Sequence, residues 1–296
     1  MKRTLLITTL LALSAGSAMA DVSLSGVGRM GIISKDGGNT FIADSRARVR
    51  FSLSGETDSG LKFGGQFRAN DAASASSGTR GTVFVEFPNF GRLTMGDAEG
   101  AAQTAVTQLP IVGYSDGVTG AVNKMQEFRF ITGGDASSGI DLAYSFTRES
   151  LGVFVSVGDP GAVGGGPTLS SSSPNNGDDR AIGVSYTTEF WKLAAGYEDN
   201  GVNTQSVISG SYGNGQAEVK VVYGKLDSGE DQQVVYGTYI IGTTTLSAFF
   251  RSDFDSFDYK GLGVSHDLGG GLALAGSYAR KDGTKAIITL GASMSF

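Results

Sequence analysis

The stretch that decides the fold reads S-R-A-R-V-R-F-S-L-S, residues 45–54. Successive side chains of a β-strand point to opposite sides. One face therefore carries Arg46, Arg48, Arg50, Ser52 and Ser54, and the other carries Ala47, Val49, Phe51 and Leu53. A soluble sheet would turn the apolar face to a core. A membrane barrel would turn it to lipid or a neighbouring subunit, and the arginines into the lumen. From this stretch alone a soluble sheet is the commoner outcome, so the rest of the chain has to decide.

The first twenty residues have the pattern of a cleaved export signal. Lys2 and Arg3 precede a short apolar run, and the A-x-A site of small residues at 18–20 follows. We therefore predict a signal peptide over 1–20 and a single mature domain over 21–296. A spanning helix needs about 20 apolar residues, and charges or Gly/Ser clusters interrupt every later candidate.

The composition excludes several classes of protein. The chain has no cysteine, so an exported form has no disulfides. Without Lys2 and Arg3, 21 basic residues face 29 acidic ones, and the formal charge is about −8. This balance argues against nucleic-acid binding, which needs a basic surface. The 46 glycines and 5 prolines fit many tight turns between long, uninterrupted strands.

From Asp21 onward the alternation recurs in about sixteen strand-like segments, which favours a closed membrane barrel. Segments of roughly 8–12 residues suit a tilted crossing of the hydrocarbon layer. The connections between them alternate between short turns and longer loops, as in barrels with short periplasmic turns and long outer loops. Tyrosines lie near both ends of the strands on the apolar face, which is typical of the two aromatic girdles.

The aromatic residues are distributed unevenly. Nine of the ten tyrosines and the single tryptophan, Trp191, lie after residue 143. The first five strands therefore lack the residues that anchor a barrel at the lipid headgroups. We predict that these five strands pack against a sister subunit in a closed cyclic oligomer.

Residues 97–138 form a long segment without a clean period. It carries mostly acids, with Lys124 and Arg129 as exceptions. Folded into the barrel, the acids would face the arginines and narrow a wide channel. As an exposed outer loop, they would merely be solvated. The residues themselves leave both readings open. Carboxylates clustered here could also bind Ca²⁺, although no spacing demands it, and we expect no cofactor.

The whole mature chain resembles the general diffusion porins of Gram-negative outer membranes, most closely those of photosynthetic purple bacteria. The matching stretches are L-S-G-V-G-R-M-G (24–31), T-D-S-G-L-K-F-G (57–64), F-G-R-L-T-M-G-D-A-E-G-A (90–101), G-Y-S-D (113–116), G-L-G-V-S-H-D-L-G-G-G (261–271) and the terminal Phe296.

This resemblance implies an all-β, 16-stranded antiparallel transmembrane barrel, assembled as a homotrimer in the outer membrane. It implies a third loop folded into the lumen as an eyelet, and passive diffusion of small hydrophilic solutes and ions. The candidate basic wall comprises Arg29, Arg46, Arg48, Arg50, Lys62 and Arg68. The candidate acids of the loop are Asp97, Glu99, Asp116, Glu127 and Asp135. The middle of the loop, 119–135, departs from relatives, so the resemblance leaves charge selectivity open.

The last strand ends in Phe296, which by the same resemblance is an address for outer-membrane assembly. We also expect its carboxylate to meet the new amino group of Asp21 where the barrel closes.

Three other functions are weighed against a diffusion channel. An outer-membrane enzyme would need a catalytic set, but His266 and Asp267 are neighbours that point apart on a strand. A soluble exported β-protein would need no terminal phenylalanine. A substrate-specific channel for sugars or phosphate would want an aromatic track or a dense basic ring along the lumen.

Overall fold

A computed structural model describes residues 21–35, 40–70, 81–114, 125–132, 140–158 and 179–296. In these ranges the chain forms sixteen β-strands and one short helix, α1 (Ala101–Val106). The strands are β1 (Asp21–Lys35), β2 (Thr40–Glu56), β3 (Lys62–Asn70), β4 (Thr82–Phe87), β5 (Gly91–Ala98), β6 (Ile140–Arg148), β7 (Leu151–Val157), β8 (Arg180–Thr187), β9 (Trp191–Asp199), β10 (Thr204–Gly213), β11 (Ala217–Leu226), β12 (Asp231–Ile241), β13 (Thr244–Ser252), β14 (Asp258–Gly269), β15 (Leu272–Lys281) and β16 (Ile287–Ser295).

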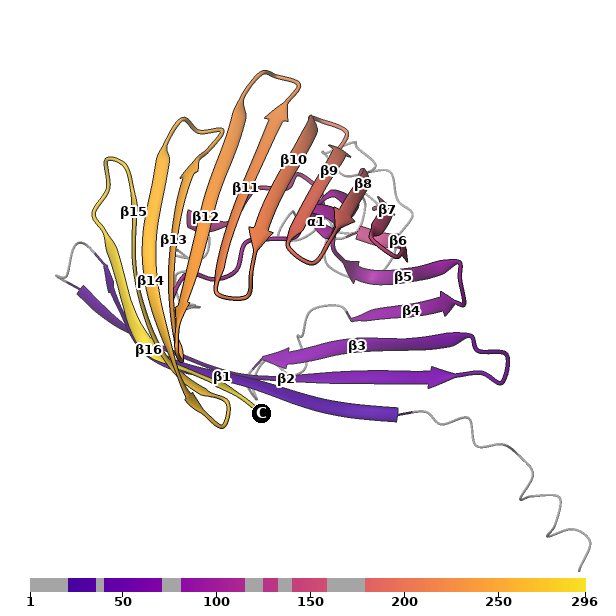
Figure 1. Ribbon diagram of the computed structural model, residues 1–296, viewed down its shortest axis with the longest axis horizontal. Coiled ribbons are helices and arrows are strands. Elements are labelled where there is room, and N and C mark those ends of the chain that lie inside the picture. The colour runs from indigo at the N-terminus through magenta and orange to yellow at the C-terminus, as the bar shows by residue number, and fades with distance from the viewer. Residues whose placement is uncertain (1–20, 36–39, 71–80, 115–124, 133–139, 159–178) are drawn as a thin grey trace, which may run out of the picture.

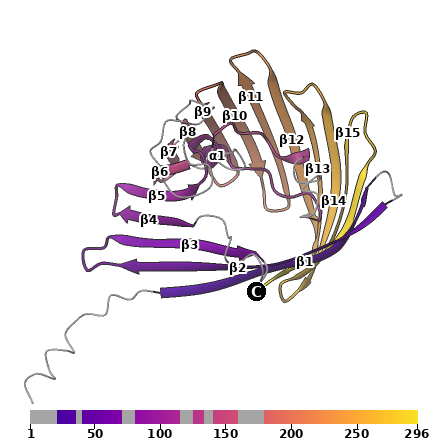
Figure 2. The same cartoon turned by 180° about the vertical axis from the view of Figure 1, so that it is seen from behind.

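Each strand pairs antiparallel with its neighbours in sequence, and β1 pairs with β16, so the sheet is a closed barrel. Figure 1 shows the strands following one another from indigo β1 to yellow β16, and Figure 2 shows the same order from behind. The predicted 16-stranded antiparallel barrel is confirmed. Among the described residues, no helix is long and apolar enough to cross a membrane.

The two faces of the barrel follow the alternation in the sequence. Along β8, Ile182 and Val184 point outward with exposed fractions of 49% and 43%, whereas Ala181, Gly183 and Ser185 are buried inside. The large apolar side chains are thus exposed on the outside, as lipid or a partner subunit requires. The two-residue turn between β12 and β13 uses Gly242 at φ 59°, a left-handed conformation that glycine adopts without strain.

The decisive stretch lies in β2, with its arginines on the inner face. Arg46 pairs with Arg29 of β1, and Arg50 pairs with Arg68 of β3, so basic side chains gather on three neighbouring strands. On the outer face of β2, the ring of Phe51 stacks on that of Phe67 with centroids 4.6 Å apart.

The barrel closes at a different point from the one we expected. The backbone N–H of Phe296 donates to the carbonyl of Gly26 (2.8 Å), and the N–H of Gly26 donates back (3.1 Å). Asp21 lies five residues further along β1, about 16 Å away at the rise of a strand. The expected contact between the amino group of Asp21 and the carboxylate of Phe296 is therefore wrong, because β1 extends past the end of β16.

The apolar core lies inside the barrel, between the segment after β5 and the wall of later strands. Residues 105–112 and Phe128 pack against buried side chains of the wall. These wall residues are Ala194, Val207, Val222, Val234, Tyr236, Phe249, Tyr259 and Ala279. The other half of the lumen, along β2–β6, contains an open cavity.

Candidate functional site

The helix α1 lies against the inner wall at β7–β9 because its side chains are small. Ala101, Ala102, Ala105 and Val106 are all buried there. The N–H of Ala101, one of the N-terminal donors that a helix cannot satisfy internally, donates to the Ser156 hydroxyl of β7 (2.9 Å).

A buried lysine holds the other end of α1. The Lys220 ammonium, on β11, donates to the carbonyl of Val106 (2.8 Å) and to the carbonyl and hydroxyl of Thr107 (2.8 and 2.9 Å). The last carbonyls of a helix lack internal partners, and a cation is favourable at that end. Lys220 is 4% exposed and therefore anchors the segment rather than meeting solutes.

Two glutamines join the outgoing and returning limbs of the segment. The Gln108 side chain donates to the carbonyl of Phe128 (2.9 Å) and accepts from its N–H (3.0 Å). The Gln126 side chain accepts from the N–H of Val112 (2.9 Å) and donates to the carbonyl of Pro110 (3.2 Å). The two limbs are thus paired much as two strands would be.

The outgoing limb reaches the far side of the barrel at β1 and β2. The Tyr114 hydroxyl donates to the Asp44 carboxylate (2.8 Å), which also forms an ion pair with Arg29 (3.0 Å). The Arg29 and Asp44 side chains are 7% and 2% exposed. Arg29 therefore anchors the segment and does not line the channel, which corrects its placement in the basic wall.

Four later strands hold the returning limb through its backbone. The Gln232 amide accepts from the N–H of Arg129 (3.0 Å) and donates to its carbonyl (2.6 Å). Arg251 donates to the carbonyl of Glu127 (2.7 Å). The buried Glu198 carboxylate accepts from the N–H of Ile131 (3.1 Å) and the hydroxyl of Thr132 (2.6 Å). Gln205 adds a bond to the carbonyl of Arg129 (3.2 Å).

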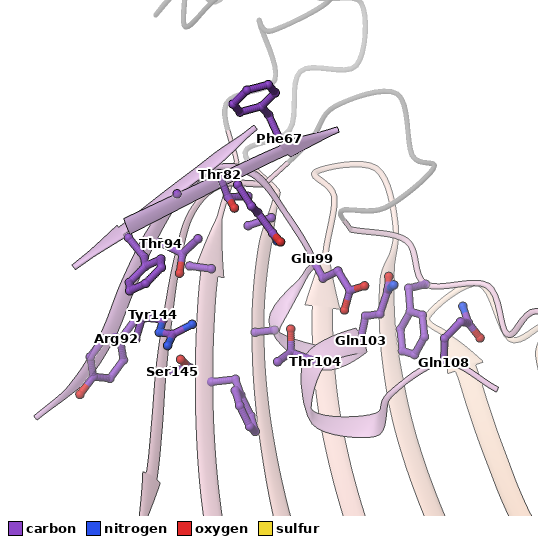
Figure 3. A pocket seen from close by; sticks show the side chains of 18 of the residues that line it. Phe67, Thr82, Arg92, Thr94, Glu99, Gln103, Thr104, Gln108, Tyr144 and Ser145 are labelled. Carbon is purple, nitrogen blue, oxygen red and sulfur yellow. The ribbon is translucent and has the colours of Figure 1, made fainter. Parts of the chain in front are cut away.

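A cavity of about 1470 Å³ remains between this segment and strands β2–β7. Figure 3 shows Arg92, Thr94 and Ser145 on one side of it and Glu99, Gln103, Thr104 and Gln108 on the other. Arg50 and Arg68 line the strand side, and Glu127 lines the segment side. Arg129 also lines the segment side, so the arginines of the wall face both acidic groups and one further arginine across the open space.

The structure separates the predicted basic residues. Arg46, Arg48 and Arg50 share the inner face of β2, and of these Arg50 lines the cavity. Lys62 lies elsewhere, at the other end of β3, where it pairs in register with Glu56 and Glu86 and lines a smaller cavity. Lys62 is thus separated from the arginines. The alternation of the sequence shows that its side chain is on the inner face, but it does not show how far along the barrel axis the side chain lies.

The predicted acids are only partly described. Glu99 and Glu127 line the large cavity. Partial burial raises the pKa of the Glu99 carboxyl above its ordinary value. Asp97 belongs to β5, but its side chain lies outside the described residues, as do Asp116 and Asp135. The described residues contain no cluster of three or more His, Cys, Asp or Glu that could hold a metal ion.

Sequence reasoning missed Arg92, which lines both cavities. Its guanidinium carbon lies 4.1 Å from the ring centroid of Phe84, and its Nε donates to Glu86 (2.8 Å). The signal was available, because Arg92 alternates with the outward Leu93 and so had to face inward. Lys220 and Arg251 were also missed, although each is an inward-facing charge, with Val222 next to Lys220 and Phe249 next to Arg251 on the same face.

An apolar exterior and a polar-lined cavity inside a closed barrel are typical of a membrane channel. Residues 8–286 match the Gram-negative porin family, and the chain belongs to it. The chain is 31% identical to a porin of Rhodobacter capsulatus, over 88% of this chain and 95% of the relative. It is 24% identical to a porin of Fuscovulum blasticum, over 93% of this chain and all of the relative.

Solved porin structures have the same fold. A porin refined at 1.8 Å resolution matches with a TM-score of 0.75 at 26% identity, over 93% of this chain and all of that one. A triple mutant of the Rhodopseudomonas blastica porin matches with a TM-score of 0.71 at 19% identity, over the same shares.

The protein is therefore an outer-membrane channel for passive diffusion, and not an enzyme. This assignment excludes a soluble exported protein. His266, the candidate base, lies at the exposed end of β14, with Nδ1 2.8 Å from the Thr244 hydroxyl.

We predict that Lys220→Met makes the open channel noisier. The change removes three hydrogen bonds and leaves the carbonyls at the end of α1 without a donor, at a cost of about 1–3 kcal/mol for a buried group. Single-channel recordings should show larger current fluctuations than in the wild type. Lys192→Met is the matched control, because Lys192 also points inward from the wall. A Lys220→Met channel as quiet as the wild type would contradict the role of this anchor.

Proposed function

We propose that residues 97–138 form the constriction of this porin, and that small hydrophilic solutes and ions pass between it and the arginine-bearing wall. One observation carries the proposal: the open cavity has Arg50 and Arg68 on its strand side, and Glu99 and Glu127 beside Arg129 on its segment side. The hydrogen bonds from β7, β9–β13 and β2 to the segment support it, because they hold the segment inside the barrel.

The opposed charges would set a field across the opening. Two unit charges ~10 Å apart interact by about 0.4 kcal/mol in bulk water and by roughly 1.7 kcal/mol at an effective dielectric of 20. Energies of this size bias the orientation of a solute and the preference for one sign of ion, but they do not trap a solute. The proposal therefore describes a filter for diffusion rather than a binding site.

We predict that replacing Arg46, Arg48 and Arg50 together by glutamine shifts ion preference toward cations. The substitution removes positive charge from the inner face of β2 and keeps the polarity of the wall. The measurement is the reversal potential of bilayer-inserted channels in a salt gradient. Arg280→Gln removes a charge at an exposed position outside the cavity and should leave the reversal potential unchanged. An unchanged potential in the triple variant would exclude the arginine wall from the pathway.

The segment side should respond in the opposite sense. Glu99→Gln shifts preference toward anions, and acidification of the wild type does the same as Glu99 takes up a proton. Because the pKa of Glu99 is raised, this change begins at a higher pH than for a fully exposed glutamate. Glu99→Gln should abolish that part of the pH dependence.

We further propose a homotrimer that packs through the outer faces of β1–β5. These faces are apolar without interface aromatics, and they expose Leu24, Met30 and Val83 at 65%, 58% and 61%. Trp191 and Tyr212, by contrast, pack together with ring centroids 4.7 Å apart on β9 and β10, as in a girdle at the lipid headgroups.

A single introduced cysteine tests this interface, because the chain has none of its own. We expect Val83→Cys, once labelled in detergent-free membranes, to be shielded from a lipid-soluble quencher. Val184→Cys on β8 should be accessible, since it is the matched outward valine on the lipid side. Native mass spectrometry should give the trimer mass. A monomer, or equal quenching at both sites, would reject the proposal.

We propose last that residues 1–20 are removed on export. The intact mass of protein purified from the outer membrane should correspond to a chain beginning at Asp21. Ala20→Phe should retain the leader, because cleavage requires a small residue at that site, whereas Ala12→Leu in the apolar run should not. Normal processing of Ala20→Phe would place the cleavage elsewhere.

A further inference from the structure

We propose that six inward-facing glycines of the barrel wall set the depth at which the described part of the segment (97–114 and 125–132) lies, and thereby the size of the opening. The inference rests on the proposed role of this segment as the constriction. The glycines are Gly31 (β1), Gly183 (β8), Gly196 (β9), Gly224 (β11), Gly263 (β14) and Gly291 (β16).

At each position a Cβ atom would collide with the segment. At Gly196 it would lie 2.5 Å from the Cβ of Ala102, and at Gly183 it would lie 2.6 Å from the Cβ of Ala105. At Gly263 it would lie 2.5 Å from the backbone nitrogen of Gly113.

The same holds for the aromatic contacts of the segment. A Cβ at Gly224 would lie 2.5 Å from the ring of Phe128, and Cβ atoms at Gly31 and Gly291 would lie 2.7 and 2.3 Å from the ring of Tyr114.

Backbone conformation does not explain these glycines. None of the six has a φ in the left-handed region. At Gly31 and Gly291 a Cβ atom would also lie 2.6 Å from a carbonyl oxygen of the neighbouring strand, whereas at Gly183, Gly196, Gly224 and Gly263 the collisions within 3 Å include the segment. Glycine inside a strand weakens the strand and marks a place where another part of the structure approaches closely. Here the approaching part is the segment, seated against six different strands. The hydrogen bonds from Lys220, Gln232 and Glu198 hold it in register, and the glycines let it lie close to the wall.

The depth matters because the cavity lies on the opposite side of the segment. Carbon atoms in ordinary contact are about 3.5–4.0 Å apart, so a methyl group at Gly196 would push α1 about 1 Å toward the cavity. Glu99 and Gln103, which line that cavity, would move with it. We therefore regard these wall glycines as positioning residues that determine the exclusion limit without touching a solute.

The test moves the methyl group from one side of the contact to the other, from Ala102 of α1 to Gly196 of the wall. Gly196→Ala should lower single-channel conductance, and it should slow liposome swelling by larger sugars more than by small ones. Adding Ala102→Gly removes the atom that collides and should restore both towards the wild type. Gly237→Ala is the matched control, because its nearest neighbour lies 3.6 Å from the added atom and belongs to β11 rather than to the segment.

If Gly196→Ala does not assemble into a barrel, a variant in the segment tests the same contact. Ala102→Val enlarges the same contact from α1, leaves every barrel strand intact, and should lower conductance in the same way. Wild-type conductance and sugar permeation in the assembled variants would overturn the inference. If Glu99→Gln still shifts the reversal potential in that event, the segment remains the constriction and only the role of the glycines fails. If Glu99→Gln also leaves the reversal potential unchanged, the proposed constriction fails too.

Discussion

Everything in this molecule depends on satisfying backbone hydrogen bonds where water is absent. A strand in hydrocarbon cannot leave its N–H and C=O groups unpaired, so the sheet must have no edge. The pairing of β1 with β16 removes the last edge, and Phe296 extends that ladder to Gly26. Once the cylinder is closed, alternation requires apolar groups outside and polar groups inside.

A closed cylinder of this size creates a second problem, which is how to fill it. Sixteen strands enclose far more space than wall side chains can occupy. Here the apolar core forms between residues 105–112 with Phe128 and the wall of later strands, so the core of the protein lies within its own lumen. Buried polar residues such as Lys220 and Glu198 pair with the backbone of the segment, as buried polar groups must. The lumen is consequently divided into a packed half and an open half.

The division of the lumen also explains why inward charges have different roles. On the packed side, Arg29 is buried against Asp44, and Arg251 holds the carbonyl of Glu127; both act as anchors. On the open side, Arg50 and Arg92 border the cavity, where, in the function we propose, their charge acts on a passing ion. The same residue type on the same face of the barrel is structural or functional according to what packs against it.

The sequence by itself determined the number of strands, which face of each is apolar, and that β2 carries an arginine-rich face. It did so because a period of two is local and every strand repeats it. It could not distinguish the buried Arg29 from Arg92, which lines the cavity. The alternation shows that both side chains point inward, but not how far along the barrel axis each lies or which segment packs against it. Only the tertiary structure decided those questions. The path of the segment depends on contacts such as Tyr114 with Asp44, which join residues 70 positions apart, and no local pattern records them.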